Sequence, residues 1–194
     1  MMRLHRLTLS ALISGLATTL FITPLYADTE VDFTANVLKD TCQLEIDGNG
    51  VVNLATVGPS YFADGVTAET DYKGGKEFLI KLISCPVSDG EITNVTFNFL
   101  PQSGQFATGN QQVFANDLTQ SDGGADNVGV VIFTNDSPRV NVLNTDGTSR
   151  AIFNAQTYSD SQWTFYARMQ KIISTDGVNT GLVRSRVIVN VYYQ

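Results

Sequence analysis

The residues of this chain that could carry out chemistry are few: two cysteines, Cys42 and Cys85, and one histidine, His5. Histidine is the general base of Ser-His-Asp and Cys-His catalysis and the commonest metal ligand. His5 lies so near the start of the chain that a cleaved leader would remove it. A mature chain without histidine has neither form of catalysis, whereas Ser-Lys and paired-carboxylate mechanisms stay open. Two cysteines cannot complete a zinc site unaided.

The leading segment has the pattern of a secretory signal. Arg3, His5 and Arg6 give a basic start, residues 7–22 are mostly apolar, and Ala27 precedes an acidic stretch. We therefore predict a cleaved signal over residues 1–27. The alternative is a membrane anchor, but the apolar run is short for a span of about 20 residues and serines and a threonine interrupt it.

Cleavage would leave residues 28–194, one domain with room for a sizeable core. The loss of Arg3 and Arg6 lowers the basic count from 12 to 10 against 19 acidic residues, a net charge of −9. Such a surface argues against nucleic acid and anionic membranes. Behind a secretory signal, Cys42 and Cys85 predict one disulfide, which would stabilise the fold by about 4 kcal/mol.

Two remaining groups of residues merit attention as candidate sites. Asp117, Asp122 and Asp126 cluster between predicted strands, but no EF-hand spacing supports a calcium site, and a polar loop is the favoured interpretation. Trp163 could belong to a sugar-binding platform. It shares a strand face with Phe165, which favours a place in the core.

Short runs of alternating apolar residues, separated by turn signals such as Asp-Gly and Gly-Gly, fill the mature chain. Period-two alternation with frequent turns predicts strands with one buried face, so the fold class is all-β, with two packed antiparallel sheets. Arg168 lies opposite Phe165 in its run, where we expect a solvated edge charge. The apolar faces of the clearest runs are Phe78/Ile80/Leu82, Val95/Phe97/Phe99, 128–133 and Phe165/Ala167/Met169.

The two ends of the mature chain complement each other. The last run places Val187, Val189, Val191 and Tyr193 on one face and then reaches the C-terminus with no later segment to pair with it. Just after the signal, residues 31–37 alternate in the same way. One end therefore has the pattern of a strand that needs a partner and the other that of a strand that can supply one, which indicates a polymerising subunit.

The chain resembles a known family, the type 1-like pilins of bacterial fimbriae built by the chaperone–usher pathway. The resemblance covers the whole mature length and rests on several pieces in order. Gly181 and the penultimate Tyr193 have the spacing of the family's chaperone-recognition motif. The other pieces are an extension leading to Cys42, an apolar strand ending at Cys85, Asn127-Val128-Gly129-Val130, and Thr164-Phe165-Tyr166-Ala167-Arg168.

The resemblance implies an incomplete immunoglobulin-like β-sandwich over 39–194, preceded by a donor-strand extension at 28–38. A periplasmic chaperone, an outer-membrane usher and neighbouring fimbrial subunits are the implied partners, and the implied route leads through the periplasm to a fimbria at the cell surface that supports adhesion. No cofactor, nucleic acid or small-molecule substrate is expected. The implied donor residues are Thr29, Val31, Phe33, Ala35 and Val37; the implied acceptor strand carries Gly181, Val187, Val189, Val191 and Tyr193.

One departure from the family concerns Ala35, which stands where these pilins commonly carry glycine. Its methyl group would fill a site that usually accepts only backbone. The competing function is a secreted β-sandwich adhesin that binds a glycan or a surface ligand, although the chain has no room for a separate lectin domain. The absence of histidine weighs against a hydrolase, so no enzyme is expected.

Overall fold

The computed structural model describes residues 29–35, 43–84, 94–154 and 162–193, and their regular elements are strands and short 3-10 turns. The predicted all-β class is confirmed. No helix in these ranges has the length and apolar character that crossing a membrane requires. The strands are β1 Thr29–Ala35, β2 Gln43–Ile46, β3 Val51–Leu54, β4 Lys76–Ser84, β5 Asn94–Pro101, β6 Phe114–Ala115, β7 Val128–Thr134, β8 Ala151–Asn154, β9 Gln162–Lys171 and β10 Arg184–Tyr193.

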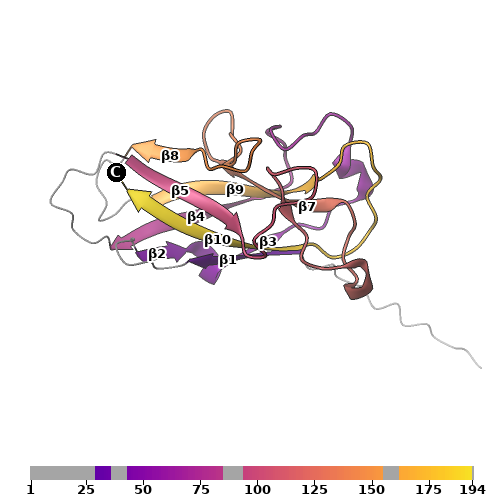
Figure 1. Cartoon of the computed structure of the whole chain (residues 1–194), viewed down its shortest axis with the longest axis horizontal. Helices are drawn as coiled ribbons and strands as arrows, with labels where there is room; N and C mark the ends of the chain where they lie inside the picture. Colours follow the sequence, from indigo (N-terminus) through magenta and orange to yellow (C-terminus); the bar gives the residue numbers. More distant parts are fainter. Residues whose placement is uncertain (1–28, 36–42, 85–93, 155–161, 194) are drawn as a thin grey trace, which may run out of the picture.

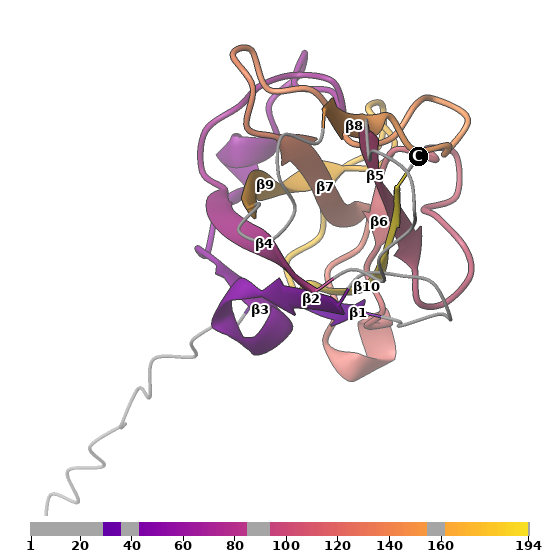
Figure 2. The ribbon, with the colours of Figure 1, turned by 90° about the vertical axis from the view of Figure 1, so that its left-hand side faces the viewer.

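The strands form two five-stranded sheets. Sheet A has the order β3-β1-β10-β5-β8, and sheet B has the order β2-β4-β9-β7-β6. In Figure 1, β10 runs beside β5 toward the C-terminus, while Figure 2 looks at the two sheets from one end of the molecule. The named strands pair antiparallel with one exception, β1 with β10. The result is the predicted β-sandwich.

Alternating residues of the facing strands fill the space between the sheets. The predicted inward face of β4 (Phe78, Ile80 and Leu82) and that of β5 (Val95, Phe97 and Phe99) are each at most 3 % exposed. The ring of Phe165 on β9 lies 5.2 Å from that of Phe97 and 5.1 Å from that of Phe99, so aromatic contacts join the two sheets. Half-buried Trp163 packs on Phe97 with the ring centroids 5.0 Å apart, which confirms its predicted place in the core.

Strand β7 is buried over its whole length, as its uniformly apolar sequence predicts. Val130 and Ile132 face the main core, whereas Val131 and Phe133 join Tyr166 in a second cluster on the other face of sheet B. Both faces of this sheet are therefore covered, which explains why β7 does not alternate between apolar and polar residues.

Arg168 is a correction, because the expected solvated edge charge is fully buried. The covering segment is residues 64–75, here called the strap. The Arg168 guanidinium donates to the carbonyl oxygens of Thr67 and Thr70, both at 2.8 Å, and to Oε1 of Gln170 at 2.6 Å. Gln170 in turn donates to the carbonyl oxygen of Val66 at 3.0 Å. Alternation along β9 identified the face, but not the distant strap that covers it.

The predicted signal (1–27) and both cysteines lie outside the described residues. Their neighbours carry some information, because Gln43 and Ser84 are Cα partners at the ends of β2 and β4. Each of these two residues is adjacent in sequence to one of the cysteines. The strand register is therefore compatible with the predicted disulfide, which stays a prediction.

Candidate functional site

The candidate site is the groove of sheet A between β3 and β10, which β1 occupies. Strand β1 runs parallel to β10, with Phe33 opposite Val187, and antiparallel to β3, with Val31 opposite Val52. Without β1, the facing edges of β3 and β10 would have no ladder partner in sheet A. The groove therefore binds an extended segment through main-chain hydrogen bonds on both sides.

Alternate residues of β1 point into the sandwich. Thr29, Val31 and Phe33 are 4 %, 0 % and 8 % exposed, and the ring of Phe33 lies 4.7 Å from that of Phe78, nearly parallel to it. Ala35, the next predicted donor residue, is a strand partner of Val189. The last, Val37, lies outside the described residues. The inward residues fill the space between the sheets where a sandwich would otherwise have a hole.

The predicted acceptor residues line the same groove. Val187, Val189 and Val191 of β10 are at most 1 % exposed, and Tyr193 continues the strand as the partner of Val95 on β5. On the other wall, Val52 and Leu54 of β3 are buried in the same core cluster. The structure thus brings predicted donor and predicted acceptor together, although they lie at opposite ends of the chain.

The last strand is not a free edge, and this corrects the expectation drawn from the chain's end. Strand β10 is paired on both sides, with β5 and with β1, so the chain's own extension closes the gap. The physical reason is that an edge strand beside an apolar groove recruits any segment with matching alternation. The extension is the matching segment that is always present, because it belongs to the same chain.

Gly181 has a packing role in this fold. A Cβ atom at this position would lie 2.4 Å from the backbone nitrogen of Ala125 and 2.4 Å from the carbonyl carbon of Gly124, so a side chain cannot be accommodated without a shift. The close approach lets Leu182 pair with Gly124 and with its neighbours, since Leu182 accepts from Ala125 N at 2.8 Å. Gly181 thus positions the segment that leads into β10.

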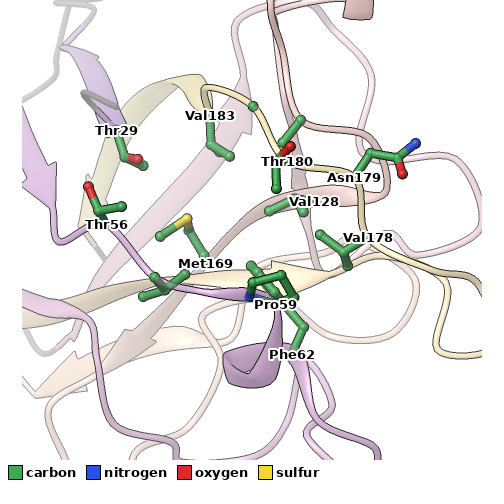
Figure 3. A pocket seen from close by; sticks show the side chains of 13 residues that line it. Thr29, Thr56, Pro59, Phe62, Val128, Met169, Val178, Asn179, Thr180 and Val183 are labelled. Atoms are coloured by element: carbon green, nitrogen blue, oxygen red, sulfur yellow. The ribbon is translucent and has the colours of Figure 1, made fainter. Parts of the chain in front are cut away.

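A cavity of about 180 Å³ lies at the end of the groove where β1 begins. Figure 3 shows Thr29 on one side of it, with Val183 and Met169 nearby and Phe62 from the segment after β3. Its lining is mainly apolar. The cavity continues the groove beyond Thr29.

The three carboxylates considered for calcium have separate partners. Asp117 pairs with Arg186, with the carboxylate oxygen 2.7 Å from Nε, while Asp122 accepts from the hydroxyl of Thr119 and Asp126 from the amide of Gln120. Among the residues that the structure describes, no group of three or more His, Cys, Asp or Glu side chains is arranged to hold a metal ion. Asp122 and Asp126 form exposed loop contacts, whereas the side chain of Asp117 is only 10 % exposed and lies against Arg186.

Comparison with known proteins gives two matches. Residues 31–194 match the family described as Fimbrial protein. The chain is also similar to a protein of Escherichia coli (strain K12) described as "Uncharacterized fimbrial-like protein YadK". The identity is 40 % over 177 residues, which cover 88 % of each chain. The family match includes the groove strands β3 and β10 and most of β1.

Proposed function

This chain belongs to the fimbrial protein family and is a subunit of a fimbria; we propose that it is a structural subunit that polymerises by donor-strand complementation. In this proposal, residues 28–38 of one subunit enter the groove between β3 and β10 of the next. The fibre is thereby a chain of sandwiches, each completed by its neighbour, and supports cell adhesion. A strand is shared across each joint, so no covalent bond between subunits is required.

The observation that supports this proposal best is the fit of β1 in its own groove. Val31 and Phe33 are almost fully buried there, and burial of these two side chains contributes about 1.5–3 kcal/mol each. Each main-chain hydrogen bond to β3 or β10 adds about 1 kcal/mol net. A second copy of the chain carries the same segment, so the groove that accepts one copy has the chemistry to accept the other.

Closure by the chain's own strand also supports the proposed partners. A tethered segment competes with an effective concentration in the millimolar range, so a neighbour's extension is at a disadvantage while the groove is filled. A partner that inserts its own strand would keep the groove folded and leave the extension free to donate. We assign this role to a periplasmic chaperone. An outer-membrane usher would then receive the subunit before it reaches the cell surface.

The proposed disulfide between Cys42 and Cys85 would tie β2 to β4 in sheet B, and β2 leads through a short turn into the groove strand β3. Gln43 and Ser84, Cα partners at the ends of β2 and β4, are each adjacent in sequence to one of the two cysteines. A bond there would limit how far β2 can separate from β4 in the absence of β1. It would preserve the groove's shape while strands are exchanged.

The test is deletion of residues 28–38 in a cell that also produces the cognate chaperone and usher. We expect the shortened subunit to be recovered with the chaperone but not to donate to other subunits, so that no fibres form from it alone. The matched control is Thr34→Ala in the full chain, a change on the exposed face of β1 that leaves the donor residues intact. Fibres built from the shortened subunit alone, seen by electron microscopy, would show that the donor assignment is wrong.

A further inference from the structure

The outward face of β1 carries two half-buried residues with carboxylates, Glu30 and Asp32, that donation by apolar side chains does not use. In the parallel register with β10, Glu30 is the Cα partner of Arg184 and Asp32 is the Cα partner of Arg186. Residues two apart on a strand share a face, and Cα partners of neighbouring strands point the same way. Two acidic positions therefore stand opposite two basic positions on the outer surface of sheet A.

The neighbours on the other side of β1 are uncharged. Glu30 is the partner of Asn53 on β3 and Asp32 is the partner of Val51, so the cations that face these carboxylates along the ladder come from β10. Arg186 also pairs with Asp117, and the negative charges of Asp117 and then Asp32 raise the pKa of its guanidinium. The outer charges of β1 and β10 therefore interact across the same ladder that holds the strand.

The matching of charges depends on strand direction. If β1 were reversed so that Val31, Phe33 and Ala35 still faced the same three positions of β10, Glu30 would stand opposite Asn190 and Asp32 opposite Ile188. Neither partner carries a charge, and the two arginines would then face the uncharged end of the strand. The apolar residues tolerate both directions, whereas the carboxylates match in one.

We infer that Glu30 and Asp32 are specificity-determining residues, whose pairing with Arg184 and Arg186 selects the parallel direction of the docked extension and so favours the self-closed monomer. The inference rests on the proposed function, because it concerns the same extension and groove. It adds a restraint on donation: the chain's own strand leaves the groove more slowly than its apolar contacts alone would dictate.

Release of β1 can be measured by capture of a fluorescent peptide of residues 28–38 by the full mature chain. At peptide concentrations where the rate of capture no longer rises, that rate is the rate at which β1 leaves the groove. A surface ion pair favours the bound strand about 1.4- to 5-fold. Like charges placed opposite each other repel and favour the released strand. We expect Glu30→Arg or Arg184→Glu to speed release about tenfold. The exchanged pair E30R/R184E should return the rate of release to within about threefold of that of the natural chain. Thr34→Gln, opposite uncharged Ile188, is the matched control and should have no effect.

Ionic strength gives a second, independent readout. Raising salt from about 0.01 M to about 1 M shortens the screening length from about 30 Å to about 3 Å. Release from the natural chain should gain speed relative to E30Q/D32N, in which both carboxylates are neutral. Single reversals that release at the natural rate, or an exchanged pair whose effect is the sum of the two singles, would overturn the inference while leaving donation by apolar residues intact. If no variant ever captures the peptide, β1 does not leave its groove and the proposed function itself fails.

Discussion

At the scale of single residues, Arg168 is the largest fully buried side chain in the described part of the chain. It is fully buried, forms no ion pair in the described part of the chain, and relies on the carbonyl oxygens of Thr67 and Thr70 and on Gln170. The ring of Phe133 lies 5.1 Å from its guanidinium carbon and adds a cation–π contact. Burial lowers the pKa of this arginine, more than the nearby tyrosine hydroxyls and Asp71 raise it. A buried cation with dipolar partners holds the strap in one place.

Replacing Arg168 by methionine should therefore destabilise the fold substantially. The carbonyl oxygens of Thr67 and Thr70 would lose their donor, and each unsatisfied buried group costs about 1–3 kcal/mol. We expect the free energy of unfolding, measured with guanidinium chloride, to fall by about 3 kcal/mol or more. Lys81→Met, which removes an exposed cation from β4, should change it by less than about 0.5 kcal/mol. Equal effects of the two substitutions would mean that the strap is held by other contacts.

Tyr61 gives a prediction for alkaline pH. Its hydroxyl is buried without a hydrogen-bond partner in the described residues, and burial raises its pKa from 10.0 to about 12, against the opposing charge of Arg168. Between pH 10 and 12 the unfolded chain releases this proton while the folded chain keeps it. The unfolded state is favoured in that window, so stability should fall as pH rises through it.

The measurement is the unfolding midpoint in guanidinium chloride at pH 9 and at pH 11. We expect the natural chain to lose more stability between these values than Tyr61→Phe, which has no proton to release at this position. Phenylalanine keeps the ring contacts with Phe62 and Tyr72. An equal loss in both proteins would show that Tyr61 does not titrate differently in the folded state.

At the scale of elements, β1 has two roles, one within its own molecule and one that the sequence analysis predicts toward another subunit. It is the second strand of sheet A, and it is the segment we propose for donation. Gly50, at the turn before β3, permits this close insertion. Its φ is +84°, and a Cβ atom there would lie 2.7 Å from the carbonyl oxygen of Phe33. The turn between β2 and β3 therefore makes room for the backbone of β1.

Phe33 should contribute most of the binding energy of this strand. Its ring stacks on Phe78, which in turn lies 5.8 Å from Phe165, so its removal would leave a cavity between the sheets. Phe33→Ala should lower the free energy of unfolding of the mature chain by about 3–5 kcal/mol. The outward change Thr34→Ala, one residue later in β1, should cost far less. A small effect of Phe33→Ala would indicate that β1 is only loosely seated in the groove.

The strap shows how a segment without regular structure can be as well fixed as a strand. The Tyr166 hydroxyl donates to the carbonyl oxygen of Tyr72 at 2.8 Å and accepts from Gly75 N at 2.7 Å, while Asn141 donates to the carbonyl oxygen of Ala68 at 2.8 Å. At the surface of the strap, Arg139 forms an ion pair with Asp71, with the guanidinium nitrogen 3.2 Å from the carboxylate oxygen. Side chains from sheet B and from the segment after β7 thus supply the partners that another strand would supply, and the strap covers this face of sheet B.

At the scale of the whole molecule, the chain is a sandwich that its own strand β1 completes. The structure places β1 of the same chain in the groove, so a chain without β1 would leave the groove unfilled. In the proposed function, polymerisation is an exchange of one strand for an equivalent one, and we expect its speed to depend on how firmly β1 is held.

Much of this architecture was predictable because it depends on local periodicity. The inward faces of β4 and β5, the buried run of β7 and the place of Trp163 follow from residue types two apart. The burial of Arg168 did not follow, because its partners Thr67 and Thr70 are about 100 residues away in sequence. The packing role of Gly181 was missed for the same reason, since its neighbours lie at Gly124 and Ala125.

The sequence by itself determined that the mature chain is an all-β domain whose two ends carry matching apolar rows, because side-chain alternation is a local property of an extended chain. Only the tertiary structure decided which molecule supplies the missing strand, and in which direction. In the structure β1 of the same chain fills the groove, parallel to β10 and with Glu30 and Asp32 opposite Arg184 and Arg186. Alternating apolar residues fit a groove in either direction, so their pattern alone leaves the direction open.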